Sequence, residues 1–356
     1  MTGRKTSVKR ISLALQGGGA HGAFTWGVLD RILQDEEIEI AAVSGTSAGA
    51  LNGAALKAGL LAGGREAARE NLDWLWEQVG AIGDMRIANW LATVTPGSGT
   101  ISRLMEYSLP FSFTEAASRM ISPYAYGPFY RNPLERIVAQ FHYDQVCHRS
   151  GPAFYVGATN VTTGKIQIFH GDKITTDAIL ASACLPTLFQ AVETTNPETG
   201  EISAYWDGGY AANPALFPLF DPDLPKDIVI VHINPLDRPG VPVTAQDIQN
   251  RINEISFNSS LLRELQGLKM VKDLIASGQL ERGSMKEILV HMIADDDMMR
   301  DLSVATKIVA SPVILYRLKE AGRAAGDRFL QEIKPRLTRE STLDLDTLCY
   351  RTAQAG

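Results

Sequence analysis

A serine held between two glycines is the residue of this chain best suited to nucleophilic chemistry. Ser47 lies in a G-x-S-x-G pattern with Gly45 and Gly49. Residues 38–43 before it form an apolar run of strand type, and residues 50–57 after it are of helix type. A strand, a sharp turn and a helix are the context of a nucleophile elbow, in which small flanking residues let the backbone turn tightly. The pattern alone also fits a glycine-rich turn with a solvated serine.

A glycine cluster nearer the start of the chain favours the catalytic interpretation. Residues 11–16 are typical of a buried strand, Gly17, Gly18 and Gly19 follow, and residues 23–33 carry apolar residues at helical spacing. This order predicts a βαβ unit with parallel strands, so the glycine loop and the serine should share the carboxyl edge of the sheet. Consecutive glycines present bare amides, which beside a nucleophilic serine would bind a tetrahedral oxyanion.

A D-G-G motif is the third element of the pattern. Asp207, Gly208 and Gly209 follow residues 202–206, a run that fits a strand. An aspartate before two glycines is usually a turn. Together with the glycine loop and the G-x-S-x-G, in this order and spacing, it makes the chain resemble the patatin-like phospholipases.

The resemblance covers residues 9–235 clearly and residues 236–335 loosely. Two lesser stretches, residues 158–164 and residues 181–186, are also similar to the family. His21 is a departure, because many relatives carry arginine after the glycines. A side-chain contribution to anion binding is therefore not implied at this position, whereas the backbone amides are unaffected.

The resemblance implies a serine–aspartate dyad without histidine. Ser47 would attack an ester carbonyl, and Asp207 would take its proton. The amides of Gly18 and Gly19 would hold the oxyanion, with Gly17 shaping the turn. An unperturbed aspartate has a pKa of about 4, so this base must be desolvated or reoriented. The implied partner is a phospholipid or other fatty-acyl ester, and the implied chemistry needs no metal or organic cofactor.

A dinucleotide site is one alternative. Gly17, Gly19 and Gly22 also fit G-x-G-x-x-G. Such a site needs an acidic residue at the carboxyl end of the second strand to bind the ribose. Glu37 and Glu39 lie at the start of that strand, which is the wrong edge.

A histidine triad is a second alternative, because Ser47, Asp207 and then His232 or His291 follow the chain order of α/β-hydrolases. Both histidines lie inside apolar, strand-like runs, where a histidine is usually a core residue. The elbow also follows the second strand here, whereas α/β-hydrolases place it after several. A catalytically silent lipid-binding or scaffolding protein of the same fold is the third alternative.

The composition is that of an ordinary globular protein. The chain has 356 residues, 45% of them hydrophobic and 21% charged, and a formal net charge of −6. This charge argues against a general nucleic-acid binder. Cys147, Cys184 and Cys349 show no paired spacing, and with no export signal we expect reduced thiols.

No apolar run approaches the ~20 residues of a transmembrane helix. Residues 11–15 are too short for a signal peptide and predict the first strand instead. No H-E-x-x-H or C-x-x-C metal pattern is present, and Asp295-Asp296-Asp297 predicts a solvated turn. We expect a cytoplasmic protein that meets lipid through a local apolar surface at a membrane, with homo-oligomerisation left open.

These elements predict a three-layer α/β/α sandwich with a mainly parallel sheet. Residues 9–335 would form the catalytic domain, with helix, strand and helix elements over residues 236–335, and residues 336–356 a polar tail. An aromatic, proline-broken insertion at about 80–135 suits either a cap over a cleft or a packed loop. Further strands are predicted at 153–159, 166–169, 227–233 and 287–293, and helices at 65–79, 174–183, 244–277 and 312–333.

Overall fold

An eight-stranded sheet forms the centre of the molecule, with the order β5-β6-β3-β2-β1-β7-β8 and β4 paired to β3. The computed structural model describes residues 8–82, 122–302, 306–307 and 310–350. Strands β3, β2, β1, β7 and β8 are parallel, and β4, β5 and β6 join through antiparallel pairs. The strands are β1 (Lys9–Leu15), β2 (Ile38–Thr46), β3 (Ala153–Asn160), β4 (Ile166–His170), β5 (Val192–Thr195), β6 (Ile202–Asp207), β7 (Asp227–Val231) and β8 (Leu289–Ile293).

The predicted βαβ unit opens the fold. β1 and β2 pair in parallel from Lys9 opposite Ile38 to Leu15 opposite Gly45. A parallel pair needs a crossover, which helix α1 (Ala23–Leu33) provides. Because the two strands run the same way, the loop after β1 and the turn after β2 lie at one edge of the sheet, as the sequence predicted.

The central strands are buried on both faces. In β7, Val229 and Val231 pack into one hydrophobic cluster, and Ile228 and Ile230 pack into the cluster on the other face. A strand covered on both sides needs apolar residues at every position. This explains why these strands are continuous apolar runs in the sequence.

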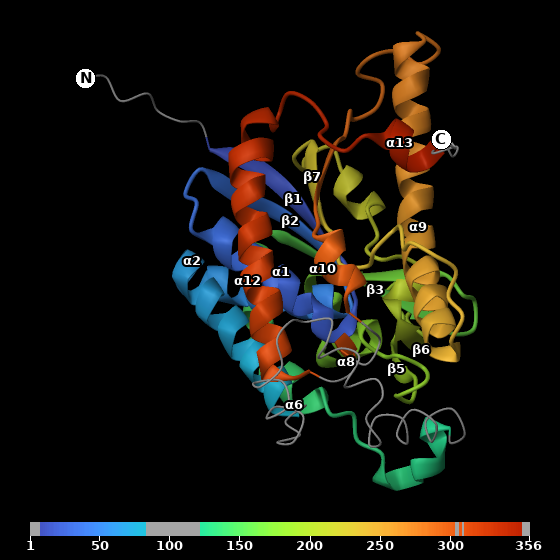
Figure 1. The fold of residues 1–356 in the computed structure, drawn as a ribbon. Helices are drawn as coiled ribbons and strands as arrows, with labels where there is room; N and C mark the ends of the chain where they lie inside the picture. Colours follow the sequence, from blue (N-terminus) through green and yellow to red (C-terminus); the bar gives the residue numbers. More distant parts are fainter. Residues whose placement is uncertain (1–7, 83–121, 303–305, 308–309, 351–356) are drawn as a thin grey trace.

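Helices cover both faces of the sheet. Figure 1 shows α1, α2 and α12 on one side and α9 with α13 on the other, which confirms the predicted three-layer fold with a mainly parallel sheet. No helix in the described ranges is long and apolar enough to cross a membrane. The remaining helices are α2 (Ala48–Ile82), α6 (Glu135–Val138), α7 (Tyr143–Val146), α8 (Thr176–Ser182), α9 (Ala245–Ala276), α10 (Asp296–Arg300), α12 (Pro312–Arg328) and α13 (Leu345–Tyr350).

Two predicted helices join into α2. The backbone is non-helical at Gly63 and at Gly64, where φ is 76°. This break lies between the helices predicted at 50–57 and 65–79. Asp295, expected in a solvated turn, instead caps α10 by accepting a hydrogen bond from the Met298 amide at 3.2 Å.

The segment expected as a polar tail packs against the sheet as far as the structure describes it. Leu337 and Leu345 are buried. The Thr342 hydroxyl lies 2.9 Å from Nδ1 of His291 in β8, and the Leu343 amide donates to Val290 O at 3.1 Å. Leu337 belongs to one of the two hydrophobic clusters and Leu345 to the cluster on the other face of the sheet, so the segment packs into both.

Most of the predicted aromatic insertion lies outside the described residues, at positions 83–121. The described remainder begins with a 3₁₀ helix at Pro123–Phe129. Ile137 and Val138 of α6 then join the core cluster that α2 and α8 build.

Candidate active site

Ser47 lies at a strained turn between β2 and α2. Its φ of 55° is in the left-handed region, which non-glycine residues rarely adopt. The Ser182 hydroxyl accepts a hydrogen bond from the Ser47 amide at 2.9 Å and donates to Gly157 O at 2.6 Å. These contacts fix the turn on β3, and the side chain is only 7% exposed. The predicted elbow geometry is therefore present, with Gly45 and Gly49 packed against each other across the turn.

The glycine loop after β1 lies against the nucleophile. A Cβ added to Gly17 would sit 2.6 Å from the Ser47 Cβ, so only glycine permits this approach. Gly19 has a φ of 58°, which also favours glycine. The amides of Gly18 and Gly19 donate to no partner among the residues that the structure describes. The role of these two amides as oxyanion donors stays a prediction of the sequence interpretation.

Gly17 has a different part, because its amide is already occupied. It donates to Oδ1 of Asn213 at 2.6 Å, and the Asn213 side-chain amide returns a bond to Gly17 O at 3.2 Å. The Asn234 side-chain amide donates to the same carbonyl at 2.8 Å. Gly17 therefore shapes the loop and cannot serve as a third oxyanion donor in this state. Both asparagines are fully buried, and the sequence interpretation missed them.

Asp207 is a buried carboxylate beside Ser47. It is 2% exposed, and one oxygen accepts the Gly209 amide at 2.8 Å. Burial raises the pKa of Asp207 to about 6, while hydrogen bonds from Ser47 and from the Gly209 amide favour the ionised form. The structure thus brings together the serine and the aspartate that are 160 positions apart in the sequence. Desolvation supplies the pKa shift that the sequence interpretation requires if Asp207 is to act as a base.

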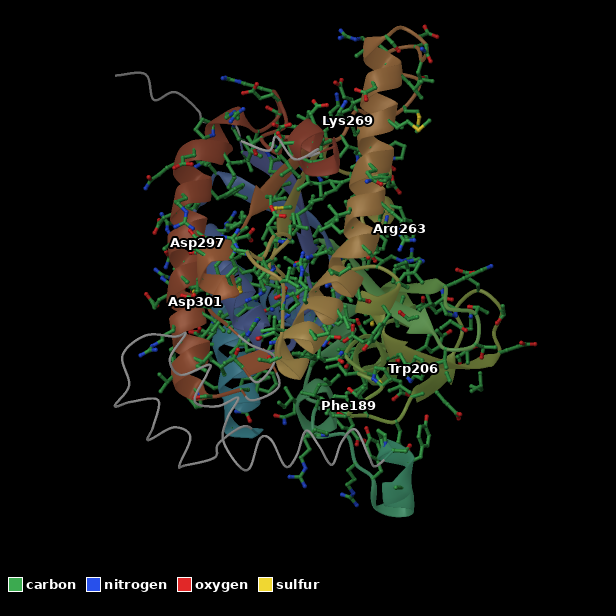
Figure 2. The ribbon with its side chains drawn as sticks, turned by 45° about the vertical axis from the view of Figure 1, so that its right-hand side comes forward. Phe189, Trp206, Arg263, Lys269, Asp297 and Asp301 are labelled. Carbon is green, nitrogen blue, oxygen red and sulfur yellow. The ribbon has the colours of Figure 1, made fainter. Side chains whose placement is uncertain are left out.

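The D-G-G loop is held by contacts on both sides. The Thr159 hydroxyl donates to Asp207 O at 2.8 Å, and the Thr46 hydroxyl donates to Ala212 O at 3.0 Å. On the outer side, the rings of Tyr210 and Phe257 meet edge to face with centroids 5.6 Å apart. Helix α9 therefore supports the loop that carries the aspartate. In Figure 2, Trp206 of β6 lies at the end of the sheet remote from Lys269 of α9.

The histidines lie away from the nucleophile or are already engaged. His291 bonds Asp227 Oδ1 through Nε2 at 3.0 Å and lies in β8, three strands from β2. His232 follows β7, two strands from β2, or roughly 10 Å by the usual spacing of about 4.8 Å. His21 is 1% exposed, with Nε2 2.8 Å from the Thr306 hydroxyl. Burial lowers the pKa of His21 well below its usual range.

Replacing His232 or His291 with glutamine should leave the chemical step intact. His291→Gln should reduce stability by about 1–3 kcal/mol, because buried polar partners lose their bonds. Turnover per folded molecule, measured with active-site titration, should stay within a few-fold of the wild-type value. A ~10²–10⁴-fold loss in correctly folded protein, the usual effect of removing a general base, would instead favour a histidine triad.

A sequence model of the patatin-like phospholipase family matches residues 13–220, which contain the glycine loop, Ser47 and Asp207. The chain belongs to this family. Patatin-like phospholipases are lipid acyl hydrolases. Membership of this family argues against a dinucleotide site at Gly17, Gly19 and Gly22. A comparison with curated proteins found none that matches.

Three solved structures are similar to this patatin-like chain at low sequence identity. VipD from Legionella pneumophila shares 15% identity, with 88% of this chain and 67% of that one covered and a TM-score of 0.34. The type III effector ExoU shares 16% identity, with 92% of this chain and 53% of that one covered and a TM-score of 0.31. The structure of the heterodimer of ExoU and SpcU, from Pseudomonas aeruginosa, shares 16% identity, with 94% of this chain and 62% of that one covered and a TM-score of 0.28. The chain thus spans little more than half the length of ExoU.

Proposed function

We propose that this protein hydrolyses carboxylic esters of phospholipids or other fatty-acyl lipids through a dyad of Ser47 and Asp207. The observation that carries the proposal is the buried Asp207, hydrogen-bonded to a serine at a strained elbow. The amides of Gly18 and Gly19 beside that serine, which donate to no partner in the described part of the chain, support it.

The first half of the reaction forms an acyl-enzyme. As the Ser47 Oγ bonds the ester carbonyl carbon, its proton passes to Asp207. The carbonyl oxygen becomes an oxyanion, which accepts hydrogen bonds from Gly18 and Gly19 and lies near the positive end of α2. Collapse of the intermediate breaks the ester C–O bond, and Asp207 returns the proton to the leaving alcohol. The alcohol product of a diacyl phospholipid is a lysophospholipid.

The second half releases the fatty acid. A water molecule gives a proton to Asp207 while its oxygen bonds the acyl carbon. The resulting oxyanion uses the same two amides. Its collapse expels the Ser47 Oγ, which recovers the proton from Asp207. These steps require the two side chains, the backbone amides and water.

Product analysis tests this proposal directly. The protein should be incubated with a mixed phospholipid extract, and free fatty acids and lysophospholipids identified by mass spectrometry. Products with wild type and none with Ser47→Ala are the expected result, together with fluorophosphonate labelling that disappears in the variant. A wild-type protein that binds lipid vesicles but neither reacts with the probe nor yields products would be a silent lipid-binding protein instead.

The pH dependence of kcat/KM should reflect the ionisation of Asp207. Only the ionised carboxylate can accept the Ser47 proton, so kcat/KM for a monomeric soluble ester should fall about tenfold per pH unit as pH drops below about 6. Burial lowers the pKa of His232 to about 4, so the titration of that residue cannot cause a fall in kcat/KM that begins near pH 6. Glu264→Gln is the matched control, because burial raises the Glu264 pKa to about 7. The assignment would be contradicted if kcat/KM fell only near pH 4, or if Glu264→Gln abolished the fall near pH 6.

A further inference from the structure

Lys307 lies directly on the glycine loop. Its carbonyl oxygen would be 2.3 Å from a Cβ at Gly19, so the two backbones touch. Its ammonium donates to Asn234 Oδ1 at 3.0 Å, and Asn234 donates in turn to Gly17 O at 2.8 Å. The same Asn234 oxygen would be 3.6 Å from a Cβ at Gly18. The ammonium is therefore two hydrogen bonds from the loop that faces Ser47.

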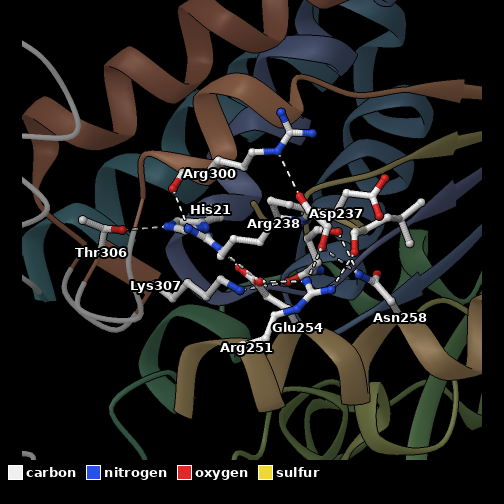
Figure 3. Close-up of polar contacts among 12 residues, drawn as sticks. His21, Asp237, Arg238, Arg251, Glu254, Asn258, Arg300, Thr306 and Lys307 are labelled. Atoms are coloured by element: carbon white, nitrogen blue, oxygen red, sulfur yellow. Dashed lines mark hydrogen bonds and ion pairs between the residues drawn. The ribbon is translucent and has the colours of Figure 1, made fainter. Parts of the chain in front are cut away.

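The carboxylate nearest to this lysine in the cluster, Glu254, is already bound by arginines. Figure 3 shows the Lys307 side chain between His21 and Arg238 on one side and Glu254 with Arg251 on the other. Glu254 is bound by Arg238 at 2.7 Å and by Arg251 at 3.3 Å. The Glu254 carboxylate is thus engaged by two arginines and acts on Lys307 only from beyond ion-pair distance. Within the described ranges, Lys307 has no carboxylate at ion-pair distance, and Asn234 is its one hydrogen-bond partner.

Lys307 is a half-buried residue, and an ammonium drawn away from water with no carboxylate at ion-pair distance among the described residues is costly unless an anion completes the site. His21 does not supply positive charge here, because burial keeps its pKa well below the usual range. We propose that Lys307 binds the phosphate of a phospholipid while the scissile ester lies at Ser47. The inference rests on the proposed hydrolase function, and it adds that phosphate-bearing esters are preferred over uncharged ones.

The chemistry of the substrate fits this placement. In a glycerophospholipid the phosphate is separated from the acyl ester by the short glycerol backbone. An anion site set one loop away from the oxyanion donors would therefore hold both groups of one molecule. The ammonium has two further protons to donate, and bonds between a charged donor and phosphate are the strong class of hydrogen bond.

The test compares two monomeric substrates that differ only in the phosphate group, the phospholipid dihexanoyl-phosphatidic acid and dihexanoylglycerol. In Lys307→Met, kcat/KM for the phospholipid should fall about 10- to 100-fold, the usual effect of losing a charged hydrogen bond. The value for dihexanoylglycerol should stay within about threefold, and fluorophosphonate titration should give the same fraction of reactive Ser47. Lys307→Arg should retain most of the preference.

The pH dependence of the phospholipid preference above pH 8 distinguishes a lysine that binds phosphate from one with a purely structural role. Burial and the charge of Arg238 lower the pKa of Lys307 to about 8, and Glu254 opposes this. The phospholipid preference should therefore be present below pH 8 and decline above it, whereas Lys307→Arg should keep it at pH 9. Neutral, buried His21 and His232 also face this region and contribute no charge there.

Lys272→Met is the matched control. Lys272 is another half-buried lysine whose pKa burial lowers, and it donates to the Ser341 hydroxyl near the far end of α9. Its replacement should leave the phospholipid preference unchanged. Equal losses on both substrates in Lys307→Met, or an unchanged preference, would overturn the inference. Hydrolysis of neither substrate by the wild type would instead refute the proposed hydrolase function.

Discussion

Ser47→Ala and Asp207→Asn are each expected to abolish ester hydrolysis, with losses of roughly 10⁴-fold or more in kcat. The first variant lacks the nucleophile. The second lacks the base, because an amide cannot accept the Ser47 proton. Residues that act as a unit give non-additive losses, so the double variant should be hardly slower than either single one. Hydrolysis of a monomeric ester, normalised to folded protein, measures all three.

Stability measurements separate lost chemistry from lost fold. The pKa of Asp207 in the folded protein is raised to about 6, above its unfolded value. The stability gained from the neutral form is therefore fully present below pH ~4 and lost as pH rises through about 6. Asparagine avoids this loss, so Asp207→Asn should melt no lower than wild type at pH 8. Ser12→Ala, which alters a buried serine of β1, should keep wild-type turnover. Near-normal turnover in either dyad variant would refute the assignment.

The first half of the fold could be predicted because its sequence signals are local. The apolar run of β1, the helical spacing of α1 and the elbow at Ser47 each follow from neighbouring residues. The helix between the two strands then provides the crossover that parallel pairing needs. The helix predicted at 244–277 is α9 (Ala245–Ala276), and the strand predicted at 227–233 is β7 (Asp227–Val231).

The antiparallel part of the sheet could not be predicted in this way. β5 has only four residues, Val192–Thr195, which alternate between half-buried and exposed. The direction of β6 depends on pairing with β3, where Asp207 lies opposite Ala158. That pairing places the aspartate at the active edge, and no local pattern encodes it. The catalytic role proposed for Asp207 rests on the family resemblance, and the structure adds that this carboxylate is buried.

The residues that hold the glycine loop could not be predicted from the sequence for a related reason. Asn213 and Asn234 come from two separate segments and share no motif with Gly17. Isolated asparagines are also common in turns, so their composition carries little information. Their burial and their bonds to one carbonyl appear only once the chain has folded.

Gly19→Ala is expected to lower kcat by about 10²–10³-fold, the usual effect of losing an oxyanion donor. The added Cβ would lie 2.3 Å from Lys307 O and would strain a residue whose φ is 58°. The loop must shift, and its amides leave the position that a developing oxyanion would occupy. Gly18→Ala should have a smaller effect, because its Cβ would meet the flexible Ile233 side chain at 2.9 Å.

The division of the Gly19→Ala effect between binding and turnover decides what the loop does. An oxyanion exists only in the transition state and the intermediate, so kcat should fall while substrate dissociation constants change little. Single-turnover kinetics with a monomeric ester measure the two separately. Gly64→Ala is the matched control, since Gly64 also has a positive φ of 76° but lies in the break of α2 with no atom near its Cβ. If Gly19→Ala weakens binding while turnover holds, the loop is a ground-state ligand site and the oxyanion role is wrong.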